Sequence, residues 1–195
     1  MMWPEPVTLE GSLVRLEVTS QAHLADLKEA SADGELHKLW YTPVPHPDAM
    51  ADEIERRLGL MAQQTMLPFS IVQKESGKAV GMTTYMNIVA AHRRLEIGHT
   101  WYRPAVQRSG LNTECKLLLL SHAFETLDCI AVEFRTHFMN RQSRAAIERL
   151  GAKLDGVLRS HMFMPDGSLR DTAVYSILAH EWPAVKAGLE FSLKR

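Results

Sequence analysis

The segment from residue 101 to residue 113 combines residue types that suit an anion-binding turn between a strand and a helix. The strand predicted before it stops at Pro104, a short connection follows, and Ser109 and Gly110 introduce the next helix. The first N–H groups of a helix lack intrahelical acceptors and lie at the positive end of its dipole. A glycine there leaves room for a phosphate to approach them. The same two residues could simply cap a core helix, and this segment alone does not decide between the two interpretations.

The spacing of apolar residues predicts the elements that must position this turn. Strands are expected from residue 9 to the Thr19–Ser20 pair and over residues 69–72, 80–85, 95–102, 130–136, 156–162 and 172–178. Helices are expected over residues 22–30, 48–63, 112–126 and 143–150, the last of them ending at Gly151. This order predicts a mixed α/β sheet with an antiparallel half and one crossover helix. With 195 residues and no internal repeat, we expect a single domain over residues 1–195.

Composition excludes several classes of protein. The net charge of −1 offers no basic surface for nucleic acid. The nine histidines are scattered rather than convergent, so no metal site is expected, and two cysteines give no disulfide framework. The longest aliphatic run, 117–120, is far too short for a membrane helix, and the first residues do not resemble a signal peptide. We therefore expect a cytoplasmic protein without a membrane partner.

Two motifs, in order along the chain, resemble those of the GNAT acetyltransferase superfamily. Residues 107–112, Gln-Arg-Ser-Gly-Leu-Asn, resemble the [Gln/Arg]-x-x-Gly-x-[Gly/Ala] signature at the start of that family's coenzyme A-binding helix. After the next strand, residues 140–143, Asn-Arg-Gln-Ser, are similar to the Asn-x-x-[Ser/Ala] start of its last helix, which also ends at a glycine. The stretches 9–16, 144–152, 156–159 and 171–178 resemble the RimJ/RimL-like branch. The resemblance covers essentially the whole chain.

The resemblance implies a fold and a reaction. The fold would be a GNAT-like mixed α/β one, with a mostly antiparallel central sheet of about six or seven strands flanked by about four helices. The reaction would be direct transfer of an acetyl group from acetyl-CoA to an amine, with no acyl-enzyme and no metal. Carried over residue by residue, the coenzyme A contacts would be Trp101, Tyr102, Arg103, Gln107, Arg108, Ser109, Gly110, Leu111, Asn112, Thr113, Asn140 and Ser143.

The reaction needs a base for the amine, and Glu96 is the first candidate because its strand leads into the turn. By alternation it would share a face with Gly98, Thr100 and Tyr102, provided that no bulge intervenes. The alternative is a structural carboxylate paired with Arg93 or Arg94. His99 and His137 are further candidates for the base, although a histidine in a strand is more often structural.

The departing thiolate needs a proton, and the resemblance assigns this role to Ser143. The motif tyrosine that many family members carry is replaced here by Ile147, so that acid is missing from this helix. The RimJ/RimL-like branch is associated with a serine in this role, at the position of Ser143. A second departure is Asn112, which stands where the signature has glycine or alanine and could donate a hydrogen bond to the pyrophosphate.

The family's acceptor site uses the loop between its first two helices, which makes Trp40, Tyr41 and Tyr85 candidate acceptor contacts. Residues 36–50 contain a single acid, Asp48, so a small or peptide-terminal α-amine suits this loop better than a lysine-rich tail. The alternatives are acetylation of a lysine or of a small-molecule or antibiotic amine. A non-catalytic acyl-CoA sensor and a scaffold that keeps the fold without a ligand also remain open, as does assembly into a homodimer.

Overall fold

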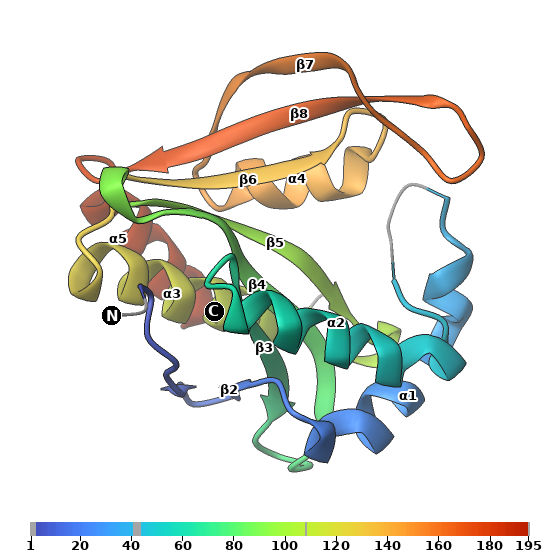
Figure 1. The fold of residues 1–195 in the computed structure, drawn as a ribbon. Helices are drawn as coiled ribbons and strands as arrows, with labels where there is room; N and C mark the ends of the chain where they lie inside the picture. Colours follow the sequence, from blue (N-terminus) through green and yellow to red (C-terminus); the bar gives the residue numbers. More distant parts are fainter. Residues whose placement is uncertain (1–2, 41–43, 108, 195) are drawn as a thin grey trace.

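The computed structural model describes residues 3–40, 44–107 and 109–194, and within these ranges the elements form one mixed sheet with helices on both faces (Figure 1). The sheet has eight strands in the order β1-β2-β3-β4-β5-β6-β8-β7. Every neighbouring pair is antiparallel except β5 and β6, which are parallel and are joined by the crossover through α3. The mixed, mostly antiparallel α/β class expected from the sequence is therefore confirmed.

The described strands and helices have the following bounds. The strands are β1 Leu9–Glu10, β2 Val14–Val18, β3 Met66–Gln73, β4 Ala79–Val89, β5 Arg94–Tyr102, β6 Ala131–His137, β7 Lys153–Phe163 and β8 Leu169–Leu178. The helices are α1 Leu24–Ala32, α2 Met50–Ala62, α3 Gly110–Ser121, α4 Arg141–Arg149 and α5 Trp182–Leu193, and a π-helical turn, His122–Thr126, continues α3. Among the described residues, no helix is long and apolar enough to cross a membrane.

Two apolar clusters show which helices cover which face of the sheet. The larger cluster joins α3, α4 and α5 to one face, with Cys115, Ile147 and Leu189 as examples from the three helices. The smaller cluster joins α1 and α2 to the opposite face and includes Met82 of β4 and Trp101 of β5. Figure 1 shows α2 in front of the sheet and α3 and α5 behind it. We call these two sides the α3 face and the α2 face.

The first predicted strand is wrong in one respect, because residues 9–16 contain a turn. Gly11 reverses the chain between β1 and β2, and its N–H donates to the carbonyl of Val14. The turn is held by the buried Glu114 carboxylate of α3, which accepts hydrogen bonds of 2.7–2.9 Å from the N–H groups of residues 12–14. A Cβ at Gly11 would come within 2.5 Å of that carboxylate, so a larger residue there would displace the group that holds the turn.

The last helix, α5, is missing from the sequence prediction. It begins at Trp182 with Pro183 in its first turn, where proline is favoured because its missing N–H needs no partner. Its buried residues, Trp182 and Leu189, lie seven positions apart on one face. The sequence therefore contained a helical pattern over residues 182–193, but only two buried positions carry it.

Candidate active site

The parallel strands β5 and β6 separate towards their carboxyl ends (Figure 1). Their ladder joins residues 94–96 to residues 131–133, whereas β5 continues to Tyr102 and β6 to His137. In the described part of the chain, the main-chain groups of residues 97–102 that face β6 therefore have no strand partner there. Such groups need another hydrogen-bonding partner, and an extended ligand can supply one. We call residues 97–102 and 134–137 the divergent ends.

A β-bulge in β5 overturns the simple alternation expected for Glu96. The register with β4 shifts by one residue between the pairs Thr84–Gly98 and Met82–Trp101, and His99 has a positive φ of 48°. After the bulge the faces exchange, so that Tyr102 packs in the α3-face cluster and Trp101 in the α2-face cluster. Glu96 and Gly98 lie on the α2 face, opposite Thr100 and Tyr102. The expectation that all four share a face is therefore wrong.

The turn before α3 has the expected helix start at Ser109 and Gly110. The structure also shows a packing role for Gly110, beside the proposed room for a phosphate. Ser109 is the N-cap, and its hydroxyl accepts a hydrogen bond of 3.3 Å from the N–H of Leu111. A Cβ on Gly110 would lie 3.3 Å from Leu13 and 3.5 Å from Leu193. The glycine thus lets α3 pack closely against the N-terminal strand region and the end of α5, whether or not a phosphate binds there.

Most side chains expected to contact coenzyme A in this turn are buried in the core or paired within the protein, although the Nε1 atom of Trp101 and the hydroxyl of Tyr102 have no hydrogen-bond partner among the described residues. The Trp101 indole is buried on the α2 face, and Tyr102 and Leu111 belong to the α3-face core. Arg103 pairs with Asp33 at 3.1 Å and with Glu29 at 3.3 Å. Gln107 donates a 3.0 Å hydrogen bond to the carbonyl of Tyr102. Any contribution of these residues to ligand binding would come chiefly from their main-chain groups. Arg108 lies outside the described residues.

The first turns of α3 and the end of α4 face each other through polar groups. Thr113 of α3 accepts a hydrogen bond of 3.4 Å from Arg149 of α4. Asn112 is half-buried, and its Oδ1 atom is buried without a hydrogen-bond partner in the described part of the protein. A buried amide oxygen without a partner is costly, so this position suits a site that a polar ligand completes.

The start of α4 lies at the open end of β6. Asn140 is its N-cap and accepts a 2.9 Å hydrogen bond from the N–H of Ser143. Ser143 is half-buried in the first turn, on the side of the sheet that also carries α3. Ile147, at the position of the family's tyrosine, is buried in the core. The capping role predicted for this motif is confirmed.

Glu96 is buried among polar groups, with 4 % of its surface exposed. The Asn87 side-chain amide donates a 2.7 Å hydrogen bond to its Oε2 atom, and Arg135 Nε lies 3.4 Å from the same oxygen. The alternative interpretation, a structural carboxylate paired with Arg93 or Arg94, is wrong in its partner, because Glu96 pairs with Arg135 and Arg94 pairs with Glu133 at 2.7 Å. Burial raises the pKa of Glu96, although Asn87 and Arg135 act in the opposite direction. A carboxylate with a raised pKa is a better base than an exposed one.

A pocket of about 450 Å³ lies on the α2 face beside the bulge. Its walls come from the segment before α2, from the first turns of α2 and from β5, and comprise Val44, Pro45, Ala49, Asp52, Glu53, Arg56 and His99. Burial, with Arg57 and Arg56 nearby, lowers the pKa of His99 to about 4. His99 is therefore neutral at physiological pH and too weakly basic to deprotonate an amine efficiently.

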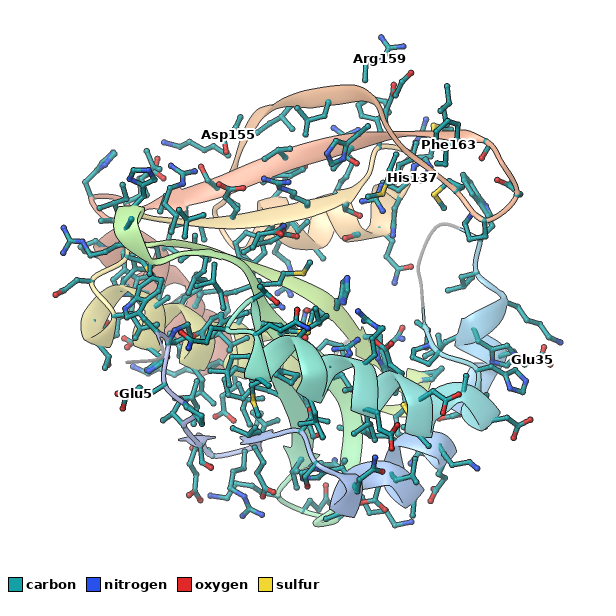
Figure 2. The ribbon with its side chains drawn as sticks, viewed as in Figure 1. Glu5, Glu35, His137, Asp155, Arg159 and Phe163 are labelled. Atoms are coloured by element: carbon teal, nitrogen blue, oxygen red, sulfur yellow. The ribbon has the colours of Figure 1, made fainter. Side chains whose placement is uncertain are left out.

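The three residues expected to contact the acceptor, Trp40, Tyr41 and Tyr85, differ in where the structure places them. Trp40 is 58 % exposed, and its ring meets that of His137 edge-on at a centroid distance of 5.0 Å, so the α1–α2 connection reaches the open end of β6. Figure 2 shows His137 above that connection. Tyr85 is fully buried and donates a hydrogen bond to the carbonyl of Leu119, which removes it from the pocket. Tyr41 lies outside the described residues.

His137 has a structural role at the end of β6. Its Nδ1 atom accepts a 3.0 Å hydrogen bond from the N–H of Met139, which shapes the turn into α4. Burial lowers its pKa. These features favour the structural interpretation over its role as the base.

Four residues around the site were not identified from the sequence. Asn87, with a positive φ of 46°, and Arg135 hold Glu96. Arg57 is 1 % exposed and joins Glu53 of α2 to Thr84 of β4 through hydrogen bonds of 2.7 and 2.8 Å. Lys116 is buried beneath β5. Of these four residues, only Asn87 had a signal in the sequence. It follows apolar strand residues, and Asn tolerates a left-handed backbone conformation, so it could mark an irregularity in the strand.

The arrangement provides two approaches to one strand. On the α3 face, the divergent ends lead from the start of α3 to the start of α4. On the α2 face, Glu96, Gly98 and the pocket lie beside the same stretch of β5. Two substrates could therefore meet across β5 and react directly. Among the described residues, no group of three or more His, Cys, Asp or Glu side chains is placed to hold a metal.

Comparison with known proteins identifies relatives of one kind. Residues 14–153 match the model of the family described as Acetyltransferase (GNAT) domain. A Bacillus subtilis strain 168 protein, provisionally named ribosomal N-acetyltransferase YdaF, is 31 % identical over 110 residues, which cover 56 % of this chain and 59 % of YdaF. The chain thus spans little more than half the length of this relative.

Two crystal structures are similar over nearly the whole chain. A GCN5-related N-acetyltransferase from Brucella melitensis is 32 % identical, with a TM-score of 0.88 and coverage of 97 % of this chain and 86 % of that one. A protein from T. thermophilus, provisionally described as an acetyltransferase, is 36 % identical, with a TM-score of 0.85 and coverage of 98 % of this chain and 100 % of that one.

Proposed function

Because the chain belongs to the GNAT acetyltransferase family, we propose that it transfers an acetyl group from acetyl-CoA directly to a primary amine, in particular the α-amine of a peptide. The observation that carries this proposal is the separation of β5 from β6 next to the start of α3. That separation supports a place for an extended thioester substrate, with its phosphates at the N-terminus of a helix.

In this proposal, coenzyme A lies on the α3 face and its pyrophosphate meets the N–H groups of residues 109–112. The main-chain groups of residues 97–102 that have no strand partner on the side of β6 bind the pantetheine chain in the manner of an added strand. The buried Oδ1 atom of Asn112 needs a donor, which an amide N–H or a hydroxyl of the pantetheine chain could supply and the acceptor-only pyrophosphate could not.

The amine approaches from the α2 face, through the pocket beside His99. Glu96 accepts the proton that the amine loses, directly or through water, and its raised pKa supports this role. The nitrogen lone pair forms the new C–N bond, the C–S bond breaks, and its electron pair remains on sulfur. A backbone N–H of residues 100–103 stabilises the oxyanion, and Ser143 supplies a proton to the thiolate.

The acceptor assignment rests on size and charge. A pocket of about 450 Å³ holds a terminal amine and a few neighbouring groups rather than a folded surface. Its acids are Asp52 and Glu53, and Glu53 is already bound by Arg56 and Arg57. Little negative charge is therefore left for a polycationic tail. The name of YdaF suggests a ribosomal protein as the source of the amine, and a flexible protein N-terminus would fit this pocket.

The test is the release of free thiol from acetyl-CoA in the presence of a panel of α-amine peptides, lysine peptides and small amines. We expect turnover that depends on both enzyme and amine. Binding of acetyl-CoA without thiol release for any amine would instead indicate an acyl-CoA sensor. Absence of both would overturn the proposal.

A further inference from the structure

Lys116 is a buried cation on the side of α3 that faces the sheet. It is 6 % exposed, and its Nζ atom donates a 2.8 Å hydrogen bond to Thr100 of β5. A longer contact of 3.5 Å reaches Thr83 of β4, and the Thr83 and Thr100 hydroxyl oxygens lie 2.8 Å apart. Both partners of the ammonium are therefore neutral hydroxyls.

The charge of Lys116 lacks a counter-ion within the described ranges of the chain. The other deeply buried cation at the site, Arg57, pairs with Glu53 at 2.7 Å. The titratable group that acts on the Lys116 charge is Cys115 of α3, and burial raises the pKa of this thiol, which keeps it neutral. Burial also lowers the pKa of Lys116, to about 8. A buried charge without a partner costs stability, and such violations concentrate at functional sites.

The position of Thr100 indicates which anion would compensate this charge. Thr100 is half-buried, lies on the α3 face, and directly follows the bulge at His99. It belongs to the divergent end of β5, where the proposed function places the thioester. Its oxygen accepts from Lys116, and its own proton can go to the Thr83 hydroxyl oxygen at 2.8 Å or to the carbonyl of Gly98 at 3.4 Å. Both are neutral acceptors, so an anion within reach would compete for this proton on favourable terms. An anion one hydrogen bond beyond this hydroxyl would lie roughly 6 Å from the ammonium.

We propose that the Lys116 ammonium, acting through the Thr100 hydroxyl, stabilises the thiolate of coenzyme A as it leaves, an inference that rests on the proposed function. The electron pair of the broken C–S bond goes to sulfur, and the negative charge is held there until sulfur takes its proton. A free thiol of this kind has a pKa of about 8.5, so modest electrostatic support is enough to stabilise the thiolate until it takes that proton. Lys116 is thus a positioning residue that supplies charge rather than a proton.

The direct measurement is the titration of the coenzyme A thiol bound to the protein, followed by the ultraviolet absorbance of the thiolate. A full positive charge roughly 6 Å away at an effective dielectric constant of about 20 lowers a thiol pKa by about two units. The pKa of Lys116 is itself lowered to about 8, so its charge is only partial where the thiol titrates and the shift is smaller. We therefore expect the bound thiol to titrate about one pH unit below free coenzyme A in the wild type. In Lys116→Met the titration should return to the free value.

Kinetics and stability separate this role from a structural one. Lys116→Met is close to isosteric and removes a buried charge, so its melting temperature at pH 7 should equal or exceed that of the wild type. Its kcat should fall about tenfold while KM for acetyl-CoA changes less than twofold. Lys28→Met, the same substitution at an exposed site in α1, is the matched control and should leave all three quantities unchanged.

Two outcomes would overturn the inference, and they are distinguishable. If the wild type bound no coenzyme A, the proposed function would fail and this inference with it. If coenzyme A bound normally but its thiol titrated alike in the wild type and in Lys116→Met, the inference alone would fail. Should the variant not fold, a wild-type thiol that titrates at or above the free value is sufficient to reject it.

Discussion

The position of the Glu96 carboxylate depends on the absence of a side chain at Gly98. A Cβ at Gly98 would lie 3.0 Å from Oε1 of Glu96 and 2.6 Å from the sulfur of Met86. The glycine therefore leaves room for the carboxylate to lie across β5, while Asn87 and Arg135 fix its other oxygen. This gives the strand glycine a role in orienting the proposed base, which the sequence pattern alone did not indicate.

Replacing Glu96 by Gln tests its role as a base through the pH dependence of kcat/KM. The carboxylate is the active form, and burial raises its pKa above the ordinary 4.5, so the wild-type rate should begin to fall at a higher pH than for an exposed glutamate. Glu96→Gln should cost most at low pH, where the amine is protonated, and progressively less towards the α-amine pKa of about 8. A variant profile that overlies the wild type at every pH would remove Glu96 from the mechanism.

Ser143 is tested by removing its hydroxyl. Ser143→Ala should lower kcat about 10²-fold, the lower end of general-acid contributions, with little change in the affinity for either substrate. The backbone N–H of residue 143 still reaches Asn140, so the start of α4 is retained. Ser143→Thr keeps a hydroxyl and should recover part of the rate. Unimpaired turnover of the alanine variant, where chemistry limits the rate, would leave Ser143 as a helix-start residue only.

At the scale of elements, the start of α3 packs against Leu13 and Leu193, and we propose that it also binds the phosphates of coenzyme A. Any side chain at Gly110 first meets Leu13 and Leu193, so a bulky substitution alone cannot isolate the anion site. Gly110→Ala and Gly110→Glu form a matched pair, because both add the same Cβ and only glutamate adds length and charge.

Coenzyme A binding to this pair, measured by calorimetry, should separate the two effects. Gly110→Ala should bind within a few-fold of the wild type. Gly110→Glu should lose binding, and with it the rise in melting temperature that coenzyme A gives by mass action. Equal affinity of the two variants would place the phosphates elsewhere.

Most elements could be predicted from sequence because their apolar spacing is regular, as in α2, α3 and the β3–β4 hairpin. The turn at Gly11 could not, because it depends on Glu114, about a hundred residues away. The bulge at His99 could not either, since no glycine marks its positive φ. That single bulge reverses the alternation of β5, and it is why the faces of Thr100 and Tyr102 relative to Glu96 were predicted wrongly.

The helix starts Ser109–Gly110 and Asn140–Ser143 were predictable from local capping chemistry. The contacts of Lys116 and Arg135 were not, because a charged residue in a sequence does not reveal whether the fold will bury it. Tyr85 shows the reverse case, since an aromatic residue expected in a pocket is buried in the core instead.

For the whole molecule, we propose that each face of the sheet binds one of the two substrates. The α3 face carries the helix starts and Lys116, and the α2 face carries Glu96 and the pocket. In the proposed mechanism the reaction takes place across β5, where the bulge exchanges the faces. This division explains how two substrates could reach one strand without competing for the same surface.

The central claim is acetyl transfer from acetyl-CoA to an α-amine, and mass spectrometry of one peptide tests it most directly. The peptide carries a free N-terminus and one internal lysine, and is incubated with acetyl-CoA with and without the enzyme. Fragmentation then locates the added acetyl group. We predict enzyme-dependent acetylation at the N-terminus, faster than at the lysine, because the α-amine has the larger neutral fraction near pH 7–8. Acetylation at the lysine with the N-terminus left free would contradict the account.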